Sequence, residues 1–274
     1  ERVPDPGQLA EKLLVSTSDH PATTTAYGLL ALKGDEIRGI VTRSRYVVGE
    51  PLRTMLPHRP ATAARLPIEL AIHNVRGAGQ RFWNFAYDRY IDESRPYVDE
   101  LEGYTFFMDG NLRTHRMAQR LDVPFRTVQQ THLIPSGGND ALTPFFFEAR
   151  DRARTGGLES SLALIDVLHI PAGEPFGLSS SRAGYALTLT FEGLPSLDHV
   201  HRARACLRDL ARRTREIGGR VHLTKNVFAT PDELESMYGE ALGRMAAAKR
   251  TYDPTGLFSS EWADRLFPQL RVSG

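Results

Sequence analysis

One segment of eight residues, Gly184 to Phe191, constrains the fold of this chain more than any other. Its large apolar side chains alternate with small or polar ones: Tyr185, Leu187, Leu189 and Phe191 against Ala186, Thr188 and Thr190. Successive side chains of a strand point to opposite faces of a sheet. The segment therefore predicts a strand with one face in a hydrophobic core and one polar face.

Two helices with clear start signals follow this strand. Ser196 can cap a helix that carries one apolar stripe and ends at Gly218-Gly219. The second helix begins at Thr230-Pro231-Asp232-Glu233, where Thr230 can cap, Pro231 suits the first turn and Glu233 can complete a capping box.

The remaining elements complete a mixed pattern. Strands are predicted over 27–33, 37–47, 103–108, 125–134, 162–168 and 220–224. Further helices are predicted over 68–90 and around Phe145 and Phe146. This order predicts an α+β fold, with a mainly antiparallel sheet and helices on one face.

Composition excludes several classes of protein. The 274 residues carry a net charge of +1, and the basic run from Arg202 to Arg220 lacks interleaved aromatics, so we expect no nucleic-acid partner. No apolar run approaches the roughly 20 residues of a transmembrane helix. The single cysteine, Cys206, fits a reducing compartment, so we expect a cytoplasmic protein.

Several common site motifs are missing from the sequence. There is no glycine-rich phosphate loop and no nucleophile elbow around a serine. His199 and His201 are two residues apart on a predicted helix, so they point to different sides and we expect no metal site.

The strongest resemblance to a known family lies in the C-terminal stretch. It runs Gly-Gly-Arg-Val-His-Leu-Thr-Lys-Asn over 218–226, followed by a helix and by Asp-Pro-Thr-Gly-Leu-Phe over 253–258. Upstream segments that match in order are 38–43, 81–87, 106–110, 127–135 and 184–188. Together they resemble the vanillyl-alcohol-oxidase-type flavoproteins, most closely the decaprenylphosphoryl-β-D-ribose oxidase family and next the aldonolactone and alditol oxidases.

The sequence departs from the ribose oxidases at several positions. Thr131 replaces a glutamine, Ala186 and Thr188 replace asparagine and cysteine, and Asp166 replaces a lysine. His222 stands where those oxidases have tyrosine, which is closer to the aldonolactone and alditol oxidases.

The resemblance implies the chemistry of an FAD-linked oxidoreductase that takes a hydride from a sugar or polyol carbinol. It places Lys225 at the catalytic position, where an ammonium group stabilises the negative charge of reduced flavin. His222 and Asn226 are the other implied cofactor contacts. Without the resemblance, a lone lysine after a strand would be interpreted as a surface residue.

The predicted substrate contacts come from four of the predicted strands. Gln129 and Thr131 are two apart on one strand and share a face, and Thr188 lies on the polar face of another. If these faces meet, they offer amide and hydroxyl groups to a polyhydroxy ligand; otherwise they form a face covered by water or a loop. His222 and Tyr104 join them by the resemblance.

The resemblance also predicts the division of the chain. Residues 1–217 would form a substrate-binding cap domain and residues 218–274 a C-terminal segment that contacts the flavin. The FAD-binding domain is missing from this sequence, so we expect the isolated chain to bind FAD weakly and to be inactive until that domain is supplied. The alternative is a non-catalytic ligand-binding or interaction module derived from the cap domain.

Overall fold

The computed structural model describes most of the chain. The described residues are 1–19, 24–45, 47–49, 70–72, 74–90, 98, 119–122, 126–136, 141–172 and 183–271. Tyr104 and the strand predicted over 103–108 lie outside them.

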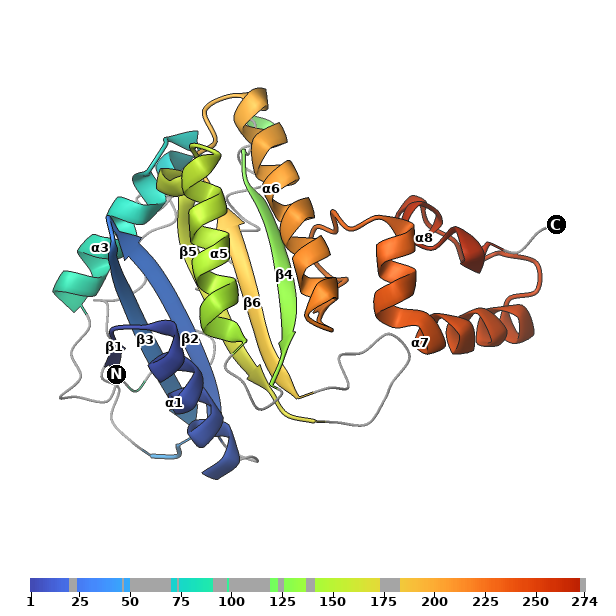
Figure 1. Cartoon of the computed structure of the whole chain (residues 1–274), viewed down its shortest axis with the longest axis horizontal. Coiled ribbons are helices and arrows are strands. Elements are labelled where there is room, and N and C mark those ends of the chain that lie inside the picture. Colours follow the sequence, from blue (N-terminus) through green and yellow to red (C-terminus); the bar gives the residue numbers. More distant parts are fainter. Residues whose placement is uncertain are drawn as a thin grey trace.

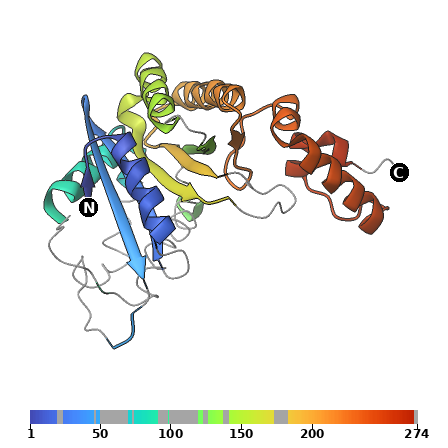
Figure 2. The ribbon, with the colours of Figure 1, turned by 60° about the horizontal axis from the view of Figure 1, so that its bottom comes forward.

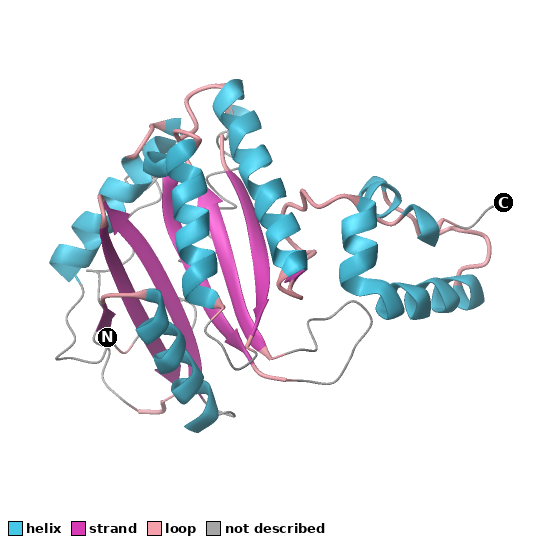
Figure 3. Cartoon of the chain, viewed as in Figure 1, coloured by secondary structure: helices cyan, strands magenta, loops and turns pink. Residues whose placement is uncertain are grey.

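A single antiparallel sheet organises the molecule (Figure 3). Its strands are β1 (Arg2–Val3), β2 (Thr24–Lys33), β3 (Glu36–Arg45), β4 (Val128–Pro135), β5 (Leu162–Ile170), β6 (Gly184–Phe191) and β7 (Arg220–Val221). Their order across the sheet is β1-β3-β2-β5-β6-β4-β7, and every pairing is antiparallel. The predicted α+β class with a mainly antiparallel sheet is confirmed.

Three helices cover one face of this sheet, as Figure 1 shows. They are α1 (Pro6–Asp19), α5 (Leu142–Thr155) and α6 (Leu197–Glu216), and the short 3₁₀ turn η1 (Glu159–Ser161) leads into β5. Their apolar stripes and the apolar face of the sheet form one core, which includes Leu9 of α1, Phe146 of α5, Leu207 of α6 and Leu187 of β6. The core is therefore on the face that the alternation of β6 predicts.

α3 (Ala78–Tyr90) packs against β2 and β5 from the opposite face, and Figure 2 shows α1 and α3 on opposite sides of the β2–β3 hairpin. It occupies the second half of the helix predicted over 68–90. A Cβ atom on Gly79 would lie 2.8 Å from the Cβ of Ala163 and 2.7 Å from the Glu192 carboxylate. Only glycine allows this close approach of the helix to the sheet.

The C-terminal residues form a smaller helical unit that projects beyond β7 (Figure 1). It contains α7 (Pro231–Tyr252), α8 (Glu261–Leu266) and the 3₁₀ turn η2 (Pro268–Leu270), around a second apolar cluster. Asp253 fixes the turn between α7 and α8, because its carboxylate accepts hydrogen bonds from Lys249 Nζ at 2.5 Å and from the Leu257 and Phe258 amides at 2.7 and 3.1 Å. This explains the Asp-Pro-Thr-Gly-Leu-Phe motif as a structural turn.

Within the described ranges, no helix has the length and apolar character needed to cross a bilayer. The same residues contain no group of three or more His, Cys, Asp or Glu side chains placed to hold a metal ion.

Candidate functional site

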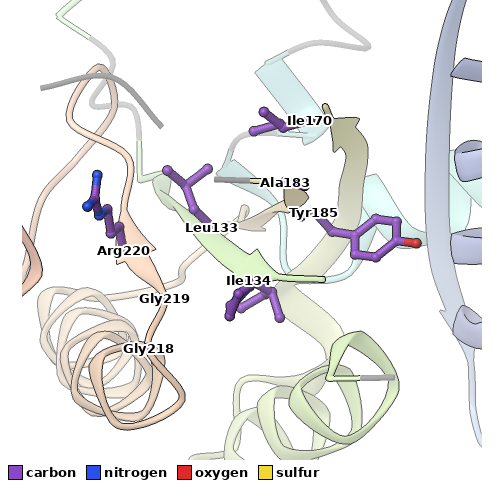
Figure 4. Close-up of a pocket in the computed structure, with 10 residues that line it drawn as sticks. Leu133, Ile134, Ile170, Ala183, Tyr185, Gly218, Gly219 and Arg220 are labelled. Atoms are coloured by element: carbon purple, nitrogen blue, oxygen red, sulfur yellow. The ribbon is translucent and has the colours of Figure 1, made fainter. Parts of the chain in front are cut away.

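The face of β4, β5 and β6 that lies opposite the core carries several polar side chains among its leucines. Figure 4 shows the alternation on β4, where Leu133 and Ile134 point to opposite sides of the strand. Ile134 belongs to the core, as do Val128 and, on β6, Leu187 and Leu189. The side chains of the intervening residues therefore share the opposite face.

One row of hydrogen-bonding residues crosses this face. Asp166 of β5 is paired with Thr188 of β6, and Thr188 with Thr131 of β4. The hydroxyl oxygens of Thr131 and Thr188 are 2.7 Å apart and both side chains are buried. The row continues at His222, whose amide donates to the Thr131 carbonyl at 2.9 Å. The sheet thus brings three of the predicted substrate residues together.

A second row lies two residues further along the strands, on the same face. Gln129 of β4 is paired with Thr190 of β6. The backbone amide of Gln129 donates to Asn226 Oδ1 at 3.2 Å. Asn226 therefore ties the loop after β7 to the start of β4, which fixes the position of the neighbouring Lys225. Its predicted contact with a cofactor stays a prediction.

Lys225 is half-buried in this loop and forms no ion pair with any described residue. Its charge acts on both Asp166 and His222, which places the ammonium group on the side of the polar face. His222 Nδ1 lies 2.8 Å from Thr224 Oγ1, so the imidazole is oriented from within the loop. Burial, and next the Lys225 charge, lower the pKa of His222, so at neutral pH this side chain is an uncharged hydrogen-bonding group.

Two carboxyl groups and a phenol on this face were not among the predicted site residues. Burial raises the pKa of Asp166 above its usual value of 3.8, while a hydrogen bond from Tyr27 and the charge of Lys225 oppose the rise. Burial, and next the Asp166 charge, raise the pKa of Glu192 to about 7. The sequence does contain a signal for Asp166: it is the one charged residue in the otherwise apolar run from Leu162 to Leu168.

The loop that carries Lys225 also borders a cleft of about 640 Å³ between α6 and α8. Its lining is rich in cations: Arg204, Arg208, Arg265 and Lys225, with His201. Arg208 donates to the Phe228 carbonyl at 3.3 Å. Among the described residues, neither Arg204 nor Arg265 has an ion-pair partner.

A much smaller cavity lies where β4 meets β6 and β7, and Figure 4 shows its lining. Here the backbones approach closely, since a Cβ on Gly184 would lie 2.1 Å from the Ile134 carbonyl oxygen and one on Gly219 2.4 Å from that of Leu133. The cavity is lined mainly by Leu133, Ile134 and backbone, with no polar cluster comparable to the two rows.

The two faces of the sheet therefore differ in chemistry. One face packs under α1, α5 and α6. The other, against which α3 also packs, holds hydroxyl, imidazole and carboxyl groups beside a lysine without an ion-pair partner in the described part of the chain. That donor set fits a flavin, because an unpaired ammonium can neutralise the charge that reduced flavin carries near N1 and C2=O.

A comparison with protein families agrees with the fit of these residues to a flavin. Residues 199–266, about a quarter of the 274, match the family of D-arabinono-1,4-lactone oxidases. Those enzymes are flavin-dependent oxidoreductases, so the C-terminal region of this chain resembles that of an FAD-linked oxidase of the aldonolactone-oxidase type. The matched region contains His222, Lys225 and Asn226. No curated protein matches the chain.

Proposed function

We propose that this chain is the substrate-binding and C-terminal part of an FAD-dependent oxidoreductase that oxidises a CH–OH group of a sugar or polyol-like substrate. The observation that carries the proposal is the position of Lys225. It stands in the region that matches the lactone oxidases, and its charge is directed to the face where Thr131, Thr188 and His222 meet.

Each residue has a separate task in this proposal. Lys225 stabilises the anionic reduced flavin, and Asn226 holds the lysine loop against β4. His222 and Gln129 hydrogen-bond substrate hydroxyls, for which a neutral imidazole and an amide are suited. Tyr104, outside the described residues, is proposed as a further substrate contact. Thr131 and Thr188 shape the floor of the site, since each hydroxyl already has the other as partner.

The FAD-binding domain is the proposed partner of this chain. The sequence contains no phosphate-binding loop, so we propose that the FAD pyrophosphate is held by residues outside these 274. Leu257 and Phe258 in the C-terminal unit expose 78% and 76% of their surface and form the proposed apolar contact with that domain. In the parent protein, the double substitution Leu257→Asp and Phe258→Asp should release FAD without lowering the melting temperature of this chain.

Anaerobic flavin spectroscopy of the parent protein tests the function. A panel of D-arabinono-1,4-lactone, xylitol, sorbitol and free aldoses is added to the flavin-loaded protein, and bleaching of the flavin band is recorded. We expect one class of polyol to bleach the band, and Lys225→Ala to slow bleaching by about 10²–10³-fold. Lys12→Ala, on α1, is the control.

Two results would count against the proposal. If no member of the panel bleaches a bound flavin, the chain is not a polyol oxidoreductase. If the folded parent protein retains no flavin band after FAD is supplied and unbound FAD is removed, the non-catalytic module is the better interpretation.

A further inference from the structure

The strongest unassigned feature of the molecule is the group formed by Asp166, Tyr27 and Glu192 on the polar face. Asp166 stands in the centre of the sheet, paired with Thr188 on one side and with Leu29 of β2 on the other. The residue is half-buried and not fully covered. A carboxylate in the middle of a sheet is costly to bury unless it is used or paired.

Three elements supply the groups that face Asp166. Tyr27 of β2 is a diagonal neighbour, at a distance that an aromatic side chain spans, and its phenol donates a hydrogen bond to the carboxylate. Lys225 supplies a positive charge from the loop after β7. Glu192 follows β6 and lies against Gly79 at the start of α3. Tyr27 and Lys225 lower the pKa of Asp166, and the Asp166 charge raises that of Glu192.

The two carboxyl groups have different surroundings. Tyr27 and Lys225 both favour the ionised form of Asp166. Glu192 lies beneath α3 and has a pKa raised to about 7, partly by the Asp166 charge. When neighbouring carboxyl groups have environments that differ in this way, one tends to hold a proton and the other to accept one.

We infer that Asp166 is the general base that accepts the proton of the substrate hydroxyl, with Tyr27 as the residue that positions its carboxylate. The inference rests on the proposed function. The substrate O–H bond breaks and its proton passes to a carboxylate oxygen of Asp166, while the carbinol C–H bond breaks with its electron pair. Bound FAD would supply the acceptor for that hydride. The carbinol becomes a carbonyl, so the substrate loses one hydride, which carries both electrons, and one proton.

The position of Asp166 supports this role over that of Glu192. Asp166 lies in the same row as Thr188, Thr131 and His222, next to the charge of Lys225. Glu192 stands at the end of β6 and is covered by α3. A base in this row can contact the same carbinol that the proposed substrate residues hold.

The first test compares flavin reduction in the parent protein across pH. The substrate is the panel member that bleaches the wild-type flavin, and the rate is expected to rise with pH through one ionisation. Asp166→Asn should slow reduction by about 10²–10⁴-fold and remove that ionisation, while Asp166→Glu should restore part of both. Asp151→Asn, on the exposed surface of α5, is the control.

The second test needs no turnover. Carbon-13 NMR of the aspartate carboxyl groups should give Asp166 a pKa above 3.8, and both Tyr27→Phe and Lys225→Ala should raise it further, because each removes a group that lowers it. An Asp166 that titrates at its usual value and ignores both substitutions overturns the proposal.

The outcomes separate this proposal from the proposed function. If the wild-type flavin is bleached and Asp166→Asn is reduced at the same rate with the same pH profile, only the role of Asp166 is wrong. If no panel member bleaches the flavin, both proposals fail together. Circular dichroism of Asp166→Asn shows whether a slow rate reflects unfolding. If it does, the NMR titrations of Tyr27→Phe and Lys225→Ala test the role of Asp166 instead.

Discussion

Thr131 and Thr188 face each other across β4 and β6, with their hydroxyl oxygens 2.7 Å apart and both side chains at least 95% buried. Each hydroxyl is the partner of the other, so replacing one by valine leaves the second without that bond. We expect Thr131→Val and Thr188→Val each to lower the free energy of unfolding by about 1–3 kcal/mol.

The double variant is the decisive comparison for this pair. Replacing both hydroxyls by methyl groups removes donor and acceptor together, so its loss of stability should be smaller than the sum of the two single losses. Chemical denaturation of the four proteins measures the difference. Strict additivity would show that the two hydroxyls do not interact in solution.

A buried histidine on the core face should make stability depend on pH. His132 Nδ1 lies 2.7 Å from Thr214 Oγ1 and its Nε2 lies 3.2 Å from Gln130 Nε2, which accounts for a neutral imidazole. Burial lowers its pKa from 6.5 to about 3. Between pH 6.5 and about pH 3, His132 therefore binds a proton in the unfolded chain but not in the folded chain.

This difference in proton binding makes the folded protein more stable as pH rises. The contribution of His132 is complete above pH 6.5 and is lost as pH falls toward 3, at about 1.4 kcal/mol per pH unit. Urea unfolding of the wild type and of His132→Phe between pH 4 and 8 measures it. The variant should be less stable at pH 8 and have a shallower slope; equal slopes would mean that His132 already titrates normally in the folded protein.

Two glycines should respond in opposite directions to the same substitution. A Cβ on Gly184 would lie 2.1 Å from the Ile134 carbonyl oxygen, so Gly184→Ala must push β6 away from β4 and should cost about 1–3 kcal/mol. Gly243 lies on the exposed side of α7 with open space around it, and Gly243→Ala should stabilise by about 0.5–1 kcal/mol. Melting temperatures report both; a tolerated Gly184→Ala would contradict the close approach of the strands.

The start of α7 provides a fourth prediction. Thr230 Oγ1 accepts from the Glu233 amide at 3.3 Å and the Glu233 carboxylate accepts from the Thr230 amide at 2.8 Å. Thr230→Ala removes half of this capping box and should cost about 1 kcal/mol. Thr251→Ala, on the exposed last turn of the same helix, is the matched control and should be neutral or slightly stabilising.

Much of the local structure could be predicted because its signals are local. The alternation of Gly184–Phe191 gave the bounds of β6, and the capping box at Thr230 gave the start of α7. Ser196 caps α6 as predicted, and Cys206 is buried in its stripe. Each of these features depends on residues a few positions apart, whose pattern the sequence displays directly.

Other elements depend on packing that no local pattern records. No helix was predicted over 6–19, although α1 packs there, with Leu9 and Leu13 fitting over Gly28 of β2. The strand predicted over 220–224 ends at Val221, after which the chain turns so that Thr224 can orient His222. α1 thus depends on a fit to a distant strand, whereas β7 ends at a local turn that the strand prediction missed.

The sequence by itself determined the alternating strands, the capped helices and a lysine at a recognisable position. Tertiary structure alone decided that Asp166, Thr188, Thr131 and His222 share one row, because the register of four strands depends on hydrogen bonds between residues far apart in the chain. It also decided that Asp166 faces Tyr27 and Lys225, and a carboxyl group acquires its chemistry from such neighbours.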